Sequence, residues 1–67
     1  MITGLIESFD DHRGDGYLIS PQGQRFYFHC VDISGGSRTI PVGVRAVAER
    51  QVGRLGRDEV VNVIALS

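Results

Sequence analysis

The stretch of the chain with the clearest chemical character is Arg25–Cys30, where aromatic and cationic side chains alternate. Successive side chains of a β-strand point to opposite faces, so the stretch divides into two sets. One set is apolar and is expected to face a core: Phe26, Phe28 and Cys30. The other set carries rings and a cation and is expected to face solvent: Arg25, Tyr27 and His29.

A second exposed ring is predicted beside this outward set. Pro21-Gln22-Gly23 has the composition of a tight turn, because proline fixes φ and glycine accepts a positive φ. The turn predicts a hairpin that joins Tyr17–Ser20 to the strand from Phe26 to Cys30. In that hairpin Tyr17 lies near Tyr27 on the solvent face, so two flat ring faces are displayed together.

Other residue patterns do not support catalysis. Asp10-Asp11 is expected to be a pair of solvated turn residues rather than an acid–base couple. His29 and Cys30 are predicted to point to opposite faces, which disfavours a nucleophile–base pair. Two histidines and one cysteine give no zinc-site spacing. We therefore expect no enzyme activity, no bound metal and no cofactor.

The elements that position the two tyrosines are short strands. Nine glycines divide the 67 residues, and no segment between them has the pattern of a long amphipathic helix. The candidate strands are Ile2–Asp10, Gly16–Ser20, Arg25–Cys30, Val44–Val52 and Asp58–Leu66. Five short strands separated by turn residues are typical of an antiparallel barrel or sandwich. The length predicts a single domain spanning residues 1–67.

Composition and charge bear on the location of the protein and on the partners it can bind. The sequence contains neither a membrane-spanning apolar run nor, at its N-terminus, the pattern of a signal peptide. The single cysteine cannot form an internal disulfide, which favours a cytoplasmic location. The net charge is −1, and all seven cations are arginines. Residues 1–15 carry a balance of −3 and residues 38–57 a balance of +4, so a basic surface in the second half is compatible with the overall charge.

Two motifs in order resemble those of the cold-shock domain family. Arg13-Gly14-Asp15-Gly16-Tyr17-Leu18-Ile19 resembles the family's first nucleic-acid motif, and Phe26-Tyr27-Phe28-His29 resembles its second. Weaker similarities, such as Asn62-Val63 near the C-terminus, extend the resemblance over essentially the whole chain. The resemblance implies an all-β fold, a five-stranded antiparallel barrel of the oligonucleotide/oligosaccharide-binding (OB) type.

The resemblance also implies a function. Such a protein binds single-stranded RNA or DNA and acts as an RNA chaperone or a regulator of transcription or translation. Unpaired bases would stack on the rings, and cations would contact phosphates. The residues expected to bind nucleic acid are Phe9, Arg13, Tyr17, Tyr27, His29, Arg38 and Arg57. Phe9, Tyr17 and Tyr27 are the predicted platforms, while His29 is expected to stack and to form a hydrogen bond.

The departures from the family pattern support an alternative. Positions that are usually aromatic in the family hold Ser8, Asp15, Cys30 and Ser37, and Glu7 is acidic where lysine is frequent. Four lost stacking surfaces and two added carboxylates favour a protein-interaction module on the same barrel, with weakened or lost nucleic-acid binding. A third alternative is a homodimer, with Gly35-Gly36 as a hinge for strand exchange.

The predicted core differs from the family's in a compensating way. Phe26 and Phe28 stand where the family typically has valines, and Ala46 and Ala48 are expected to face inward where larger residues are frequent. Large side chains on one strand would offset small ones on another and conserve core volume.

Overall fold

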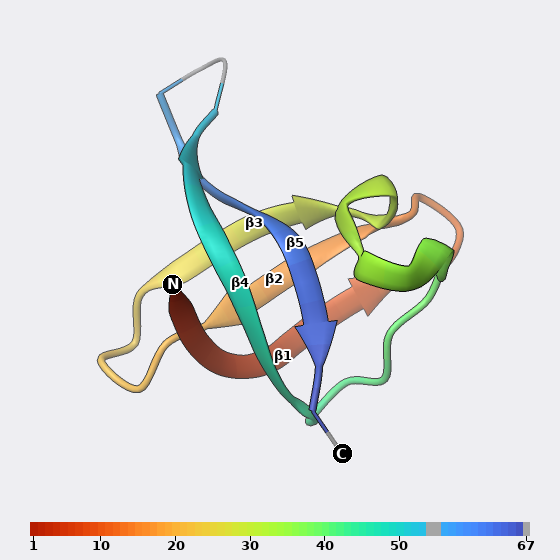
Figure 1. Cartoon of the computed structure of the whole chain (residues 1–67), viewed down its shortest axis with the longest axis horizontal. Helices are drawn as coiled ribbons and strands as arrows, with labels where there is room; N and C mark the ends of the chain where they lie inside the picture. Colours follow the sequence, from red (N-terminus) through yellow and green to blue (C-terminus); the bar gives the residue numbers. More distant parts are fainter. Residues whose placement is uncertain (54–55, 67) are drawn as a thin grey trace.

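Five β-strands form the chain, as seen in a computed structural model that describes residues 1–53 and 56–66 (Figure 1). The strands are β1 (Ile2–Asp10), β2 (Asp15–Ile19), β3 (Arg25–His29), β4 (Arg45–Val52) and β5 (Asp58–Ala65). Two 3₁₀ turns, Cys30–Asp32 and Ser34–Gly36, follow β3. No helix in the described residues is long and apolar enough to cross a membrane. Each predicted strand is present, with bounds that differ by at most one residue.

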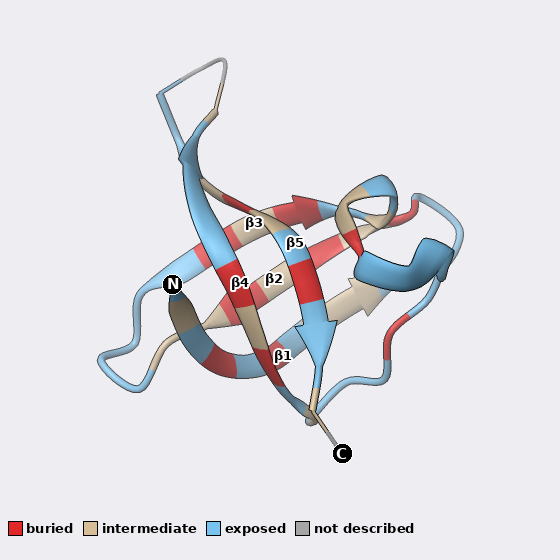
Figure 2. Cartoon of the chain, in the orientation of Figure 1, coloured by how far each residue is buried: buried red, intermediate tan, exposed pale blue. Residues whose placement is uncertain are grey.

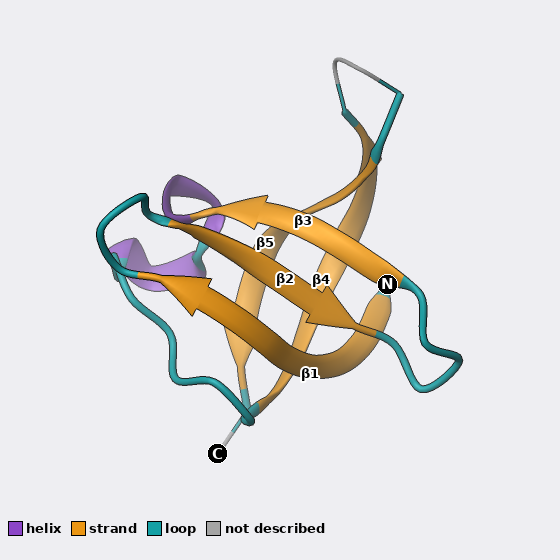
Figure 3. Cartoon of the chain, turned by 180° about the vertical axis from the view of Figure 1, so that it is seen from behind, coloured by secondary structure: helices purple, strands orange, loops and turns teal. Residues whose placement is uncertain are grey.

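The strands close into a barrel in the order β1-β2-β3-β5-β4, which confirms the predicted all-β barrel. Figure 3 shows β1, β2 and β3 as a curved sheet in front of the β4–β5 hairpin. All neighbours run antiparallel except β3 and β5, which are parallel and meet at Tyr27 and Glu59. The prediction of a wholly antiparallel barrel was therefore wrong in this detail. Strand directions cannot alternate all the way round a closed ring with an odd number of strands, so one pair must be parallel.

Strand β1 belongs to both halves of the barrel because it bends sharply. Its first residues pair with β4 and its later residues pair with β2, and Leu5 pairs with both. Gly4 is buried at this bend, where a Cβ atom would overlap the carbonyl oxygen of Ile19. An irregularity between Ile6 and Ser8 then leaves Glu7 outside the regular pairing. Such a bulge increases local twist, which helps a short strand to close a small barrel.

The core consists of the inward residues of every strand, and Figure 2 shows the buried positions as bands along them. Its fully buried members include Ile6, Leu18, Val60 and Val63. Phe26 and Phe28 are 2% and 1% exposed, as their alternation with Tyr27 predicts. Ala46 and Ala48 are 0% and 1% exposed in the same core cluster as the two phenylalanines. This arrangement fits the expected conservation of core volume.

The β2–β3 hairpin has the predicted turn. The backbone N–H of Gly23 donates to the carbonyl of Ser20 over 2.9 Å, and Gly23 has a φ of 87° that favours glycine. At the other end of β3 the strand stops at His29, and Cys30 begins a 3₁₀ turn. The turn therefore fixes the register between β2 and β3, and this register determines which outward side chains lie next to each other.

Candidate nucleic-acid interface

Tyr17 and Tyr27 lie directly opposite each other on β2 and β3, on the outer face of the barrel. Their ring centroids are 5.7 Å apart and the ring planes meet at 72°, an edge-to-face contact. Both residues are half-buried rather than turned into the core. The sequence-based expectation of two neighbouring outward tyrosines is confirmed.

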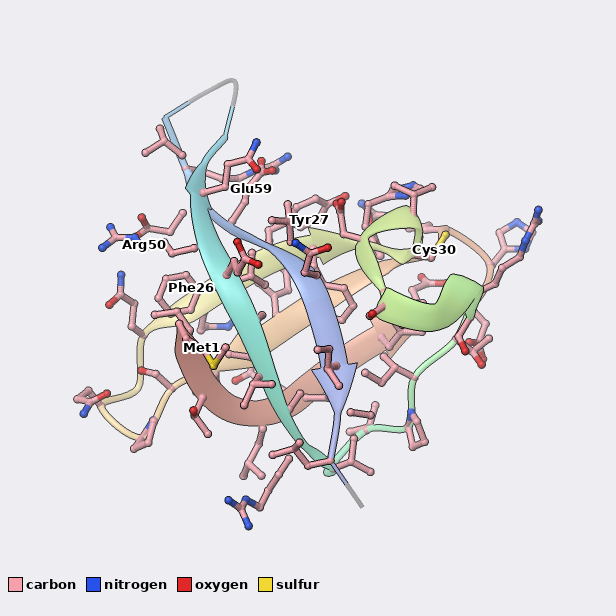
Figure 4. The ribbon with its side chains drawn as sticks, in the orientation of Figure 1. Met1, Phe26, Tyr27, Cys30, Arg50 and Glu59 are labelled. Carbon is pink, nitrogen blue, oxygen red and sulfur yellow. The ribbon has the colours of Figure 1, made fainter. Side chains whose placement is uncertain are left out.

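An arginine covers a face of each tyrosine ring. The guanidinium carbon of Arg25 lies 4.4 Å from the centroid of Tyr17, and that of Arg57 lies 4.1 Å from the centroid of Tyr27. Each arginine is also bound by a carboxylate. Nε of Arg25 donates to Glu7 over 2.6 Å, and Nε of Arg57 donates to Glu59 over 3.1 Å. Tyr27 and Glu59 lie at the parallel junction of β3 and β5, where Figure 4 labels both side chains.

The hydroxyl of Tyr27 forms a further contact, a hydrogen bond to a carboxylate. This hydroxyl donates to Oδ2 of Asp15 over 2.8 Å, and Nη2 of Arg13 donates to the same oxygen over 3.2 Å. Burial raises the pKa of Tyr27 above its usual value, and the hydrogen bond and negative charge of Asp15 raise this pKa further. The hydroxyl of Tyr27 therefore stays protonated to a higher pH than that of a free tyrosine.

The predicted site residues line a groove above β1, β2 and β3, which we call the tyrosine groove. Its volume is about 440 Å³, within the range of small-ligand sites. Five of the seven predicted residues line it: Phe9, Arg13, Tyr17, Tyr27 and Arg57. Phe9 is only partly available, because its ring stacks on the core residue Phe28 with centroids 5.9 Å apart. Its half-buried position gives it both a packing role and a place in the groove wall.

Two further hollows continue from the tyrosine groove. The first, of about 830 Å³, shares Tyr27 and Arg57 with it and extends over the parallel junction to Gln51 and His29. The second, of about 440 Å³, shares His29 with the first and ends at Arg38. Each of the seven predicted residues therefore lines at least one of three hollows, and neighbouring hollows have lining residues in common.

His29 has a structural contact that the sequence did not indicate. Its Nδ1 accepts the backbone N–H of Val31 over 3.3 Å and so caps the first 3₁₀ turn. Because Cys30 leaves the strand, its Sγ lies 3.8 Å from the same nitrogen. The two side chains approach each other where the strand ends, although His29 is exposed and Cys30 packs half-buried against the core, as the alternation predicted. Nδ1 is already engaged by the backbone amide, and Nε2 is the nitrogen left for a ligand.

The surface is not a uniformly basic one. Arg13, Arg25 and Arg57 each form an ion pair with a carboxylate, and the arginine side chains are half or more exposed. Their carboxylate partners are less exposed, at 12% for Asp15, 34% for Glu7 and 25% for Glu59, so each pair lies at the border between protein and solvent. Arg38 forms no ion pair with the described residues. Arg54, which contributes to the basic balance of residues 38–57, lies outside the described residues.

Arg25 and Asp15 are part of the site, although neither was predicted as a binding residue. The hairpin register pairs Ile19 with Arg25, which places Arg25 diagonally across from Tyr17. The same register would have revealed Arg25 from the sequence once the turn at Gly23 was fixed. Asp15 was recognised only as a departure from an aromatic position, and its contact with Tyr27 depends on three-dimensional placement.

Comparisons with known proteins add no family to this description. No protein-family model matches the chain, and no curated protein is significantly similar to it in sequence. Among the described residues, no group of three or more histidine, cysteine or acidic side chains is placed to hold a metal ion.

Proposed function

We propose that this chain binds single-stranded RNA or DNA on the tyrosine groove, as a divergent relative of cold-shock proteins. The observation that supports the proposal best is the pair of outward tyrosines 5.7 Å apart, each accompanied by a guanidinium group. Rings that face solvent on neighbouring strands are suited to successive unpaired bases, and arginines beside them are suited to the linking phosphates. A role as an RNA chaperone or a regulator of transcription or translation follows from the motif resemblance alone, and the proposed cytoplasmic location follows from the single cysteine.

The energetics favour exchange of the internal contacts for a ligand. An exposed cation–π contact is worth about 0.5–1 kcal/mol, whereas a base stacked on an aromatic ring is worth about 1–3 kcal/mol. A base can therefore displace Arg57 from the face of Tyr27, or it can stack on the guanidinium plane itself. The displaced arginine remains within reach of the neighbouring phosphate. The arginines thus cover the rings in the free protein and contact the backbone in the complex.

A second candidate function is a protein-interaction module on the same surface. The observation in its favour is the set of carboxylates that pair with the site arginines: Glu7, Asp15 and Glu59. Paired charges of both signs are suited to a polar protein partner, and they lower the attraction for a polyanion. A binding assay with nucleic acid separates the two candidates.

The test is a titration of labelled heptathymidine and of a labelled RNA heptamer of mixed sequence, followed by anisotropy at two salt concentrations. The proposal predicts saturable binding that weakens as salt rises, with a slope near −2 in logarithmic units if three arginines contact phosphate. Substitution of Tyr27→Ala should weaken binding at least fivefold, which corresponds to the loss of about 1 kcal/mol.

The matched control is Ile64→Ala, which removes a large side chain that is 46% exposed on β5 and does not line the tyrosine groove. This variant should bind both oligonucleotides as the parent does. If neither heptamer binds at low salt, the proposal is refuted. Recovery of a stoichiometric protein partner under the same conditions would then support the interaction module.

A further inference from the structure

Asp15 occupies a distinctive place in the tyrosine groove. It is the first residue of β2 and lies outward with Tyr17, between Asp10 on β1 and His29 on β3. Its side chain is only 12% exposed, yet it forms part of the groove wall. The carboxylate is thus largely buried in the wall of the groove, beside the hydroxyl of Tyr27.

The two oxygens of this carboxylate have different surroundings. Oδ2 accepts hydrogen bonds from the hydroxyl of Tyr27 and from Arg13, which fix the orientation of the group. Oδ1 accepts no hydrogen bond from any side chain or backbone group within residues 1–53 and 56–66. A carboxylate oxygen has two lone pairs, so Oδ1 can accept two further N–H groups. Asp10 adds a second carboxylate to the same groove.

The four bases differ in what they offer to such an acceptor. Guanine presents two adjacent donors, N1–H and the N2 amino group, on its Watson–Crick edge. Adenine and cytosine each present one amino group beside a ring nitrogen that is itself an acceptor. Thymine and uracil present one N–H between two carbonyl oxygens, which the carboxylates repel. Low exposure makes this distinction stronger, because a poorly matched base leaves polar groups unpaired in the groove.

We infer that Asp15 is the base-reading residue of this groove and that it selects guanine over thymine or uracil within a single strand. The inference rests on the proposed function, because it concerns which base occupies the site proposed above. The inference gives a function to the acidic residue that stands at position 15, where the resembled family usually has an aromatic residue. The carboxylate weakens the attraction for phosphate and in return discriminates among bases.

The experiment uses heptamers of thymidine in which only the central base is changed to guanine, hypoxanthine or adenine. A single guanine avoids self-association of guanine-rich strands. We expect the guanine heptamer to bind about tenfold more tightly than heptathymidine, as for one well-matched base contact. Hypoxanthine keeps N1–H but lacks the 2-amino group, so its heptamer should bind with intermediate affinity.

Two variants isolate the carboxylate. Asp15→Asn keeps the shape and can still accept from Tyr27, but it replaces one oxygen by a donor, so the guanine-to-thymine affinity ratio should fall to one or below. Asp11→Asn removes the same charge from an exposed residue outside the groove, so it should leave the ratio unchanged. Absolute affinity can rise in both variants because each removes a negative charge. The affinity ratio is therefore the measured quantity.

The possible outcomes distinguish the inferred role of Asp15 from the proposed function of the chain. Equal binding of all four heptamers, or a ratio that persists in Asp15→Asn, would overturn the role of Asp15 and leave the proposed function standing. Stronger binding of heptathymidine than of the guanine heptamer would overturn it as well. Failure of every heptamer to bind would overturn both the proposed function and the inference.

Discussion

The two faces of β3 are stabilised in different ways, although their residues alternate along one short strand. The inner face consists of Phe26 and Phe28, which are almost completely buried. The outer face carries Arg25, Tyr27 and His29, which are exposed or half-buried and form hydrogen bonds, ring contacts and an ion pair. Burial of apolar surface is non-directional, whereas each outer contact needs a particular partner at a particular distance.

This difference separates stability from binding. The inner contacts are mainly apolar, with only the guanidinium of Arg50 at 6.0 Å from the centroid of Phe26, so their contribution should vary little with salt or with mild changes of pH. The outer contacts involve guanidinium and carboxylate groups, so they should respond to both. The proposed ligand would exchange with outer contacts, which are separate from the core. The predictions below test this separation, beginning with the largest expected effect.

The inner face should dominate the free energy of unfolding. Phe28→Val removes most of a fully buried ring and leaves a cavity beside Phe9, so it should destabilise the chain by about 2–3 kcal/mol. Such a loss is a large fraction of the stability of a domain of this size. The midpoint of urea unfolding should fall by the same amount at low and at high salt.

The comparison variant for this experiment is Val31→Ala, which truncates a side chain that is 78% exposed. It should change the free energy of unfolding by less than about 0.5 kcal/mol. A Phe28→Val protein that unfolds at the parent midpoint would contradict the proposed role of the two phenylalanines in filling the core opposite Ala46 and Ala48.

The outer face should dominate the salt dependence of binding. Arg57→Ala removes a cation that borders two of the three hollows, so the logarithmic salt slope for a single strand should become shallower by about 0.7. Arg45→Ala removes the same charge from an exposed position outside those hollows. It should leave the slope unchanged, and equal slopes for the two variants would place the phosphate contacts elsewhere.

Hydrogen bonds to carboxylates on the outer surface of other strands should also make the free energy of unfolding sensitive to acid. Hydrogen bonds from Arg50 and Gln24 lower the pKa of Asp58, and the backbone N–H of Arg13 lowers the pKa of Asp10. A carboxyl with a lowered folded-state pKa adds stability above its unfolded pKa near 4, and this stability is lost as pH falls through the folded-state value. Unfolding midpoints should therefore decrease below about pH 4. Asp58→Asn should flatten this decrease, and an unaltered pH profile in that variant would argue against the contribution of Asp58.

The smallest effect concerns the titration of Tyr27. In a Tyr17→Phe background, tyrosinate absorbance reports Tyr27 alone, and its midpoint should lie above the usual value near 10. Asp15→Asn should move the midpoint downward, because the carboxylate both accepts from the hydroxyl and repels the tyrosinate. A midpoint that does not move would mean that burial alone raises this pKa.

The sequence is informative wherever burial decides the structure. Alternation along Arg25–Cys30 and the turn at Gly23 predicted the orientation of five consecutive side chains and the neighbouring position of Tyr17. Glycines in the turns predicted the bounds of β4 and β5 closely, because Gly43, Gly53 and Gly56 lie just outside these strands. These features depend on local periodicity, which a single sequence contains.

The sequence is less informative where distant charges meet. The contacts of Glu7 with Arg25 and of Asp15 with Tyr27 join residues 18 and 12 positions apart, so they depend on register and bulges. From the sequence, Glu7 and Asp15 were interpreted only as unfavourable charges. Only the folded structure shows that both carboxylates accept hydrogen bonds. The path of Cys30 was missed because a 3₁₀ turn of three residues has no periodic signal.

The parallel junction between β3 and β5 has a consequence for the order in which the molecule assembles. The β1–β2–β3 meander contains contacts that are local in the chain, whereas Tyr27 reaches Glu59 only after a long loop and β4 have been ordered. Contacts between residues that are distant in sequence incur the larger entropic cost and tend to form late in folding. Because Arg57 contacts Tyr27 across that junction, a nascent chain that has released only its first half lacks one wall of the tyrosine groove. The groove is therefore complete only in a chain whose ring of strands has closed.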